Sequence, residues 1–356
     1  MKKLFLMLVA ALVMQTMAAQ NSDKQVATLQ HGDQTFVFYG LDAFKQAYEA
    51  AADTLDVITL SSGEFNGLLD IKKSITVYGA GFENDTITGT PRTYVQYISG
   101  ITANGVHLEG LYIDSETYFG IQVGYNRAAN IYDANTPIYN LEIVKCYVYT
   151  LWFAPDTYNC TIRQSHIDNT IGLVRNNPNI RKIMHNFYVA NSYIFGVVNN
   201  RFGGEYRPAD FASFDLSSTI WVDHCVLKYP DISGPWLYTN NIIYNGVNAN
   251  GTNNIYLGDG EPYKDEMTNN WINVSPEYVW AEEGENGEYA PNKTFAIKTP
   301  EHYHATDGTE IGLHGGVYAW NKIPCTPRIT ECTIDTENVA NGMLKLSIKA
   351  EAQTKE

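Results

Sequence analysis

Five segments of the chain repeat one eight-residue pattern: LEIVKCYV at Leu141–Val148, CTIRQSHI at Cys160–Ile167, FYVANSYI at Phe187–Ile194, IWVDHCVL at Ile220–Leu227 and WLYTNNII at Trp236–Ile243. In each segment, positions 1, 3 and 8 are apolar and position 6 is small or polar. A looser copy, VHLEGLYI, precedes them at Val106–Ile113. A repeat of this kind indicates a solenoid, in which each copy contributes to one coil.

The spacing within the pattern predicts how each coil turns. Apolar residues two apart are typical of a strand with one buried face. The unconstrained positions 4 and 5 indicate a bend, and position 6 then points into a narrow part of the interior before a second short strand. The expected inward stack at position 6 consists of Cys146, Ser165, Ser192, Cys225 and Asn241.

The distance between copies is irregular. The third position of the pattern falls at residues 143, 162, 189, 222 and 238, so the steps are 19, 27, 33 and 16 residues. Such steps fit coils of roughly 20 residues interrupted by loops. Because parallel strands joined by crossovers are almost always right-handed, the sequence predicts an all-β fold, a single right-handed parallel β-helix. We expect the β-helix over residues 57–320.

Both ends of a solenoid expose an open core, and the flanking sequence contains candidates to cover them. Residues 20–56 are expected to form an N-terminal strand and a capping helix, since Leu41–Ala52 (LDAFKQAYEAAA) has apolar residues at helical spacing. Residues 321–356 are expected to form a small C-terminal strand or hairpin appendage and a charged tail. Cys325 and Cys332 are close enough in sequence to allow a disulfide there.

The first 19 residues have the features of a signal peptide. Lys2 and Lys3 precede the apolar stretch Leu4–Val13, which is too short to span a bilayer, and small residues follow at Ala18 and Ala19. Cleavage near Ala19 predicts a secreted protein, located outside the cell, on its surface or in a periplasm. No later stretch has the ~18 consecutive apolar residues of a membrane span.

The mature chain would be strongly acidic. Removing residues 1–19 takes away two of the 24 basic residues and none of the 39 acidic ones, so the net charge becomes 22 − 39 = −17. A field of this sign repels nucleic acid and anionic lipid, which disfavours both as partners. The 25 Tyr and 6 Trp residues instead favour a surface that stacks on sugars.

Two longer stretches resemble a known superfamily, the right-handed parallel β-helix proteins that include pectate lyases. Gly40–Phe82 is similar to the usual opening of such proteins, and Asn270–Gly316 is similar to the ending of bacterial extracellular members. Asp307–Gly316 (DGTEIGLHGG) is the most specific part of this resemblance. The resemblance covers nearly the whole mature chain and implies the architecture, whereas its motifs do not specify an activity.

The repeat also predicts which side chains share a surface, because coils stack at ~4.8 Å and outward positions align in columns. One set of outward residues would form a saccharide-binding face: Lys145, Tyr147, His166, Tyr188, Tyr193 and Trp221. The candidate catalytic residues on the same face are Arg163, Asp223 and His224, because acid–base chemistry needs a carboxylate or a basic side chain beside the bond that breaks.

The leading hypothesis is a secreted β-helix that binds an extracellular polysaccharide and could also process it, as a lyase or a glycoside hydrolase. One alternative is a non-catalytic structural or adhesive solenoid that recognises a protein partner. Another is a polysaccharide lyase in which Ca²⁺, the cofactor that this alternative implies, neutralises a uronate carboxylate. The Asp-Asp, Gly-His-Gly and Arg-x-Lys motifs of polygalacturonase-like members are absent. No metal-binding residues are predicted.

Overall fold

The computed structural model describes residues 25–52, 54–86, 88–114, 120–126, 131–132, 136–153, 156–173, 184–198, 220–230, 237–244, 251–259, 262–282, 287–291, 293–326, 328–340 and 343–351. The expected signal peptide lies outside these residues. Within the described ranges, no helix is long and apolar enough to cross a membrane.

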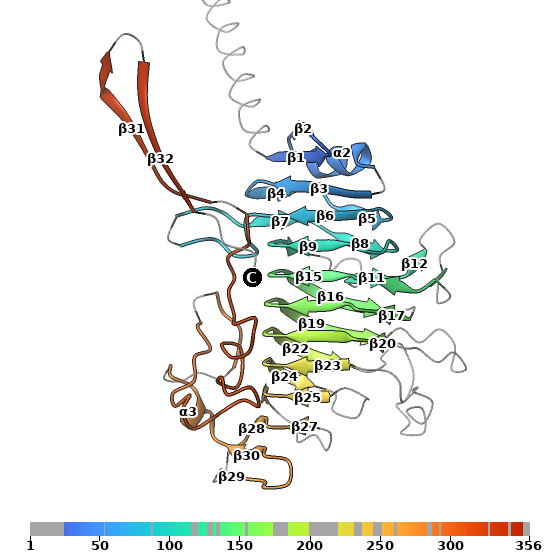
Figure 1. Cartoon of the computed structure of the whole chain (residues 1–356), viewed down its shortest axis with the longest axis vertical. Coiled ribbons are helices and arrows are strands. Elements are labelled where there is room, and N and C mark those ends of the chain that lie inside the picture. The colour runs from blue at the N-terminus through green and yellow to red at the C-terminus, as the bar shows by residue number, and fades with distance from the viewer. Residues whose placement is uncertain are drawn as a thin grey trace, which may run out of the picture.

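Most described residues belong to strands that stack into two long sheets (Figure 1). The first sheet contains, in order across it, β2 (Gln34–Tyr39), β1 (Val26–His31), β3 (Thr54–Leu60), β6 (Ser74–Tyr78), β9 (His107–Glu109), β15 (Glu142–Val144), β18 (Thr161–Arg163), β21 (Phe187–Ala190), β23 (Ile220–Asp223), β25 (Leu237–Thr239) and β27 (Gly251–Thr252). From β3 onward each strand pairs in parallel with the next. Strand β1 pairs antiparallel with both β2 and β3.

The second sheet contains the strands that follow the bend of each coil. In order from the N-terminal end they are β4 (Gly63–Phe65), β7 (Thr93–Val95), β10 (Tyr112–Ile113), β16 (Tyr147–Phe153), β19 (His166–Leu173), β22 (Tyr193–Val198), β24 (Val226–Pro230), β26 (Ile242–Ile243), β28 (Ile255–Leu257), β30 (Trp271–Val274) and β29 (Tyr263–Lys264). Strands β5 (Leu68–Ile71), β8 (Ile98–Ile101) and β11 (Ile121–Val123) join it beside β16. Among these strands, β29 pairs antiparallel.

Smaller sheets complete the described strands. Strands β14 (Ile138–Tyr139), β17 (Thr157–Tyr158) and β20 (Met184–His185) pair in parallel, and β12 (Tyr125–Asn126) pairs antiparallel with β13 (Ile131–Tyr132). Because the chain passes from sheet to sheet in a fixed order and each strand pairs with its counterpart in the next coil, the arrangement is compatible with the predicted all-β parallel solenoid.

The register of the first sheet confirms the alignment of the sequence repeat. The third positions of the five copies pair in succession, from Ile143 through Ile162, Val189 and Val222 to Tyr238. Leu108 of the looser copy pairs with Ile143. All of these side chains are buried, so the two-residue spacing of apolar positions does mark the inward face of the sheet.

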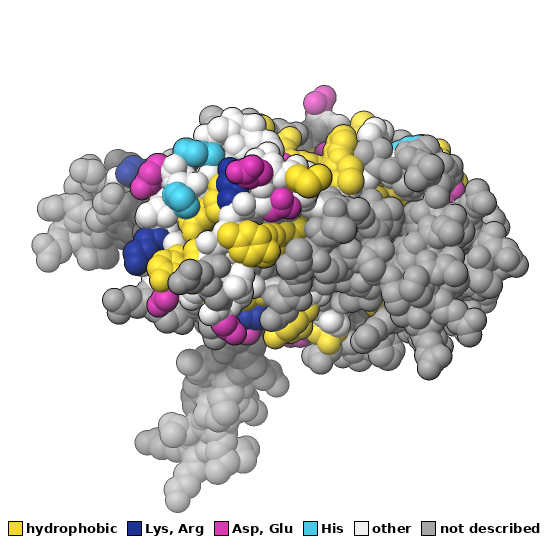
Figure 2. Space-filling view, turned by 90° about the horizontal axis from the view of Figure 1, so that it is seen from below, with side chains coloured by type: hydrophobic (Ala, Val, Ile, Leu, Met, Phe, Trp, Pro, Cys, Tyr) yellow, Lys and Arg dark blue, Asp and Glu magenta, His cyan; other side chains and the backbone are white. Residues whose placement is uncertain are grey.

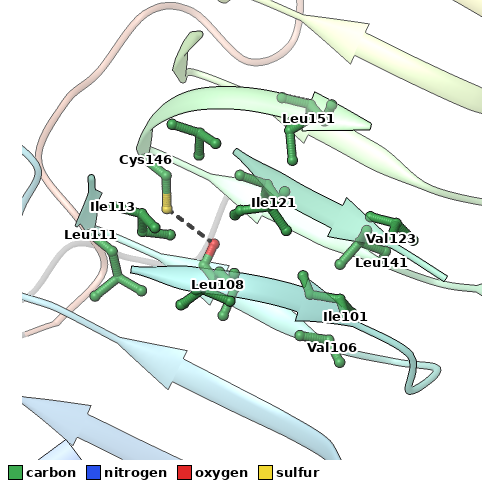
Figure 3. Close-up of a cluster of buried hydrophobic side chains, with 14 of the residues drawn as sticks. Ile101, Val106, Leu108, Leu111, Ile113, Ile121, Val123, Leu141, Cys146 and Leu151 are labelled. Atoms are coloured by element: carbon green, nitrogen blue, oxygen red, sulfur yellow. Dashed lines mark hydrogen bonds between the residues drawn. The ribbon is translucent and has the colours of Figure 1, made fainter. Parts of the chain in front are cut away.

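The interior is filled by apolar side chains that stack from coil to coil. Figure 3 shows such a cluster, in which Leu108 of β9, Ile113 of β10 and Ile121 of β11 point into the interior. The Cys146 thiol donates a hydrogen bond to the carbonyl of Leu108, at 3.5 Å. Cys146 therefore packs as a small buried residue whose one polar group is satisfied inside the stack.

Position 6 of the repeat forms a ladder of buried polar groups. The Cys146 amide donates to Ser165 Oγ at 3.1 Å, and the Ser165 amide donates to Ser192 Oγ at 3.1 Å. Farther along, the Cys225 amide donates to Asn241 Oδ1 at 2.8 Å. The five residues expected in this stack are all buried, which confirms the inward placement of position 6.

The ladder continues past the last copy of the repeat. The Asn241 amide donates to Asn254 Oδ1 at 2.9 Å, and the Asn254 amide donates to Asn270 Oδ1 at 2.8 Å. Asn254 Nδ2 also donates to the carbonyl of Tyr238. Two further coils therefore have asparagine at position 6. In the first of them, Gly251 occupies the third position, opposite Tyr238 of the preceding coil.

A short helix covers the N-terminal end of the stack (Figure 1). The helix expected at Leu41–Ala52 forms over Ala43–Ala50, as α2, and buries Ala43, Phe44 and Ala47 against the first coils. Its buried residues lie three and four apart, which is the spacing of one helix face.

The parallel coils end earlier than the predicted boundary at residue 320. The last coil strand is β30, and after the helical turn α3 (Pro276–Val279) the chain runs back along the outside of the stack (Figure 1). The predicted boundary followed the resemblance of Asn270–Gly316 to the ending of parallel β-helix proteins, but the residues after α3 pack against the second sheet and add no coil to it. Beyond them, β31 (Arg328–Ala340) and β32 (Met343–Glu351) form a separate antiparallel hairpin.

The returning segment docks on the bends of the coils, and we call His304–Thr326 the strap. Its backbone carbonyls accept hydrogen bonds from position-5 side chains. The donor and acceptor pairs are Asn253 Nδ2 to His304, Asn191 Nδ2 to Leu313 and Gly315, Gln164 Nε2 to Ala319, and Lys145 Nζ to Ile323. The strap therefore crosses the bends of several coils, and four of these bends donate a side-chain hydrogen bond to its backbone.

The asparagine ladder generates a testable prediction. Replacing Asn254 by Leu leaves the Asn241 amide and the Tyr238 carbonyl without their partners in the interior. An unpaired buried group costs about 1–3 kcal/mol, so Asn254→Leu is expected to lower the free energy of unfolding by about 2–4 kcal/mol in chemical denaturation. The exposed substitution Gln34→Leu is the control. If Asn254→Leu and Gln34→Leu lower the free energy of unfolding by the same small amount, the ladder does not stabilise the fold.

Candidate functional site

An open hollow lies on the outer face of the first sheet, across strands β21, β23, β25 and β27. Its volume is about 610 Å³, and its lining residues are Asn186, Tyr188, Trp221, Asp223, Leu237, Thr239 and Thr252. The register aligns Tyr188 with Trp221 and Leu237, and it aligns Asp223 with Thr239 and Thr252. We call this site the Trp221 hollow.

Trp221 is the large aromatic side chain that the hollow exposes most. It is 41% exposed, and Leu237 in the next coil is 43% exposed. Figure 2 views the molecule from below and shows hydrophobic side chains intermingled with acidic ones and histidines. An exposed indole beside fixed polar groups is typical of a binding surface, because a solvated tryptophan contributes nothing to the core.

Asp223 is held in place by its neighbours. The Tyr188 hydroxyl donates to its Oδ2 at 2.9 Å, and Thr239 Oγ1 and Asn240 Nδ2 each donate to its Oδ1 at 2.8 Å. His224 Nδ1 lies 3.1 Å from Oδ2. Four polar neighbours therefore fix the position of the carboxylate at the edge of the hollow.

The same contacts keep Asp223 ionised. Burial opposes its ionisation, but the hydrogen bonds from His224, Thr239 and Asn240 outweigh this effect, so the pKa of the carboxyl lies below its usual value. Burial and the adjacent Asp223 charge raise the pKa of Tyr188, which stays protonated and donates. The hollow thus presents a fixed negative charge beside aromatic and hydroxyl groups.

Two of the predicted site residues are covered by the strap and do not face solvent. Lys145 is 8% exposed and His224 is 2% exposed. Gly315 and Gly316 lie directly over His224; a Cβ atom at Gly315 would come within 2.6 Å of the imidazole. The expectation that Lys145 and His224 lie on an open face is wrong, because the bend that carries them is where the strap binds.

Arg163 also interacts with the strap. Its guanidinium lies over the ring of Tyr318, 4.8 Å from the centroid. Strand β18, which carries Arg163, is two coils from the strand of Asp223, which corresponds to ~10 Å at the usual strand spacing. The structure therefore does not bring the three candidate catalytic residues together.

The predicted aromatic column at position 7 is largely buried as well. His166 and Tyr193 are covered by the segment after α3, where the Tyr289 ring lies 3.8 Å from His166 and the Tyr193 hydroxyl donates to the carbonyl of Gly287 at 2.8 Å. Burial lowers the pKa of His166. The segment forms a second hydrophobic cluster against the second sheet. The prediction that His166 and Tyr193 are exposed is therefore wrong.

Tyr147 stacks within its own column. Its ring lies parallel to that of Tyr112, with centroids 4.0 Å apart, and its hydroxyl donates to Asp168 at 2.8 Å. Of the nine residues predicted for the site, the hollow thus gathers Tyr188, Trp221 and Asp223.

Sequence reasoning missed four lining residues. The repeat places Leu237 and Thr239 on the same face as Trp221, but neither side chain is chemically distinctive. Asn186 precedes its copy of the repeat by one residue, and Thr252 belongs to a coil that lacks the full pattern. Aligning the coils by their position-6 asparagines would have identified Thr252.

A second polar cluster lies on the same sheet, nearer the N-terminal end. His107 Nδ1 lies 2.7 Å from Glu142 Oε2, and His107 Nε2 lies 3.2 Å from Glu109 Oε2. The amide of Cys325, in the strap, donates to Glu109 Oε1 at 2.9 Å. The Cys325 thiol is free, so the disulfide with Cys332 that the sequence allowed is not formed. This cluster anchors the end of the strap.

Neither a metal-binding cluster nor a similar known protein indicates a reaction for these two sites. Within the described part of the chain, no group of three or more His, Cys, Asp or Glu side chains is placed to hold a metal ion. No protein-family model matches the chain, and no curated protein or solved structure matches it significantly. The geometry of the Trp221 hollow is therefore the basis for a functional proposal.

The His107 cluster predicts a pH dependence of stability. Burial opposes protonation of His107, but hydrogen bonds to Glu109 and Glu142 outweigh it and raise its pKa. A raised pKa stabilises the fold below the unfolded value of about 6.5, and this contribution is lost as pH rises through the folded value. In urea titrations, the wild-type protein should have a higher free energy of unfolding than His107→Gln at low pH. This difference should fall as the pH rises above about 6.5. The control is His302→Gln, which changes an exposed histidine. If the difference between wild type and His107→Gln does not change with pH, the ion pairs of His107 do not stabilise the fold.

Proposed function

We propose that this protein binds an extracellular polysaccharide through the Trp221 hollow. The observation that carries the proposal is an indole, 41% exposed, beside an open hollow of about 610 Å³ whose edge holds a fixed carboxylate. Sugar rings have apolar faces that stack on aromatic side chains and hydroxyl groups that need fixed polar partners. The hollow offers both kinds of contact within one surface.

The proposal includes the finer architecture and the location of the protein. The parallel pairing of successive coils and the rule for crossover handedness support a single right-handed parallel β-helix. The basic and apolar N-terminal sequence supports export, which would bring the hollow into contact with extracellular glycans.

Binding fits the hollow better than catalysis. Glycoside hydrolysis uses a pair of carboxyl groups ~5–9.5 Å apart, and Asp223 is the one acid among the described lining residues. Asp223 is occupied by four polar neighbours, and its lowered pKa makes it a poor proton donor. For a calcium-assisted lyase, the described residues offer no ligand group around the hollow.

Recognition of a protein partner is the rival function. A protein partner would bury a broader surface than the hollow, at least ~1,000 Å² in total. It would therefore depend on exposed residues away from Trp221, such as Tyr229 on β24, which is 48% exposed. This difference makes the two functions separable by substitution.

The test is a panel of plant and microbial polysaccharides assayed by affinity electrophoresis and calorimetry. Trp221→Ala should weaken binding at least about tenfold, since exposed aromatic anchors carry much of the binding energy. Tyr229→Ala, which removes an equally exposed aromatic residue outside the hollow, should leave the affinity unchanged.

Two results would refute the proposal. One is that no polysaccharide in the panel binds to the folded wild-type protein. The other is that a polysaccharide binds and both variants retain its full affinity. Unsaturated product absorbance from any polysaccharide would show that the protein is a lyase.

A further inference from the structure

The charges around the Trp221 hollow indicate which kind of polysaccharide it takes. The described lining residues contain one carboxylate, Asp223, and no Lys, Arg or His. We infer that the hollow selects an uncharged polysaccharide chain over one that carries carboxylate or sulfate groups. This inference rests on the proposed function and adds the chemical class of the ligand.

Several basic side chains of the two sheets have partners of their own. His224 contacts Asp223 from beneath the strap, 3.1 Å from its carboxylate, and does not reach the surface. Arg163 lies over Tyr318. On the second sheet, Lys228 forms an ion pair with Glu288 at 3.1 Å, and Lys264 lies over Trp271. Among the described residues, none of these cations is positioned to neutralise an acidic sugar in the hollow.

An acidic sugar would therefore lie beside the negative charge of Asp223. Asp223 remains a carboxylate because its hydrogen bonds outweigh the effect of burial, and a second carboxylate a few ångströms away would be repelled. Sugar hydroxyl groups, in contrast, can donate to carboxylate and hydroxyl oxygens without any charge cost. The chain as a whole, with a net charge of −15, adds repulsion of the same sign.

The shape of the hollow favours a chain over a single sugar. Its lining residues come from strands β21, β23, β25 and β27, which are successive neighbours in the first sheet. Four strands at ~4.8 Å spacing extend the surface over ~14 Å, which accommodates several linked sugar residues. The exposed Trp221 and Leu237 side chains lie in adjacent coils along this line.

Matched pairs of polysaccharides test the inference directly. Hydroxyethyl cellulose is compared with carboxymethyl cellulose, and fully methyl-esterified homogalacturonan with the de-esterified polymer, because each pair differs mainly in charge. Among the pairs that bind, the uncharged member should bind more tightly at low salt. High salt should narrow the difference by strengthening the binding of the charged member alone, because salt screens the repulsion.

Variants at Thr252 change the charge of the hollow without disturbing the Asp223 contacts. Thr252 is exposed at the edge of the hollow, on β27. Thr252→Lys should raise the affinity for the charged member about two- to fivefold, and Thr252→Glu should lower it by a similar factor. Thr252→Gln is the uncharged control and should leave the ratio within a pair unchanged.

The outcomes separate this inference from the proposed function. If a charged member binds better than its uncharged partner, the inference is wrong although the hollow binds polysaccharide. If neither member of any pair binds, and the wider panel also fails, the proposed function itself is wrong. A preference for uncharged chains that Thr252→Lys reduces supports the inference.

Discussion

Each coil of the repeat depends on one backbone conformation, the left-handed bend at position 5. Lys145, Gln164, Asn191, His224 and Asn240 adopt φ values between 44° and 58° there. This conformation costs an L-residue roughly 1–2 kcal/mol, and the costs recur from coil to coil. The bend turns position 6 into the interior, where the side chains of Ser165, Ser192 and Asn241 each accept a hydrogen bond from the amide of the preceding coil. The polar ladder therefore depends on the strained bend, which places the position-6 side chains in the interior.

The same bend determines where the strap can bind and which face stays open. Position-5 side chains leave the stack at the corner between the two sheets, and those of Lys145, Gln164 and Asn191 donate hydrogen bonds to strap carbonyls. The strap and the segment before it then cover the corner and the outer side of the second sheet. The outer face of β21, β23, β25 and β27 retains the open Trp221 hollow.

The coils could be predicted from the sequence because their inward positions repeat. The site was predicted poorly because the segments that cover the coils contain no repeat. The register at Ile143, Ile162 and Val189 follows from apolar spacing alone. The burial of His224 and Tyr193 depends on residues 91 and 102 positions later, Gly315 and Phe295, and no local pattern reports such contacts. Trp221 and Asp223 were predicted from their outward positions in the repeat, and both line the hollow because no described segment covers that part of the sheet.

The repeated bend, the covering C-terminal segment and the uncovered aromatic face together support a proposed site for uncharged glycan chains. A crystal structure of the protein soaked with a neutral hexasaccharide selected from the binding panel tests this claim most directly. We expect sugar rings stacked on Trp221, with hydroxyl groups in hydrogen-bonding distance of Asp223 or Tyr188 and the strap in place. Sugar bound at another face, with the Trp221 hollow filled by water, would contradict it.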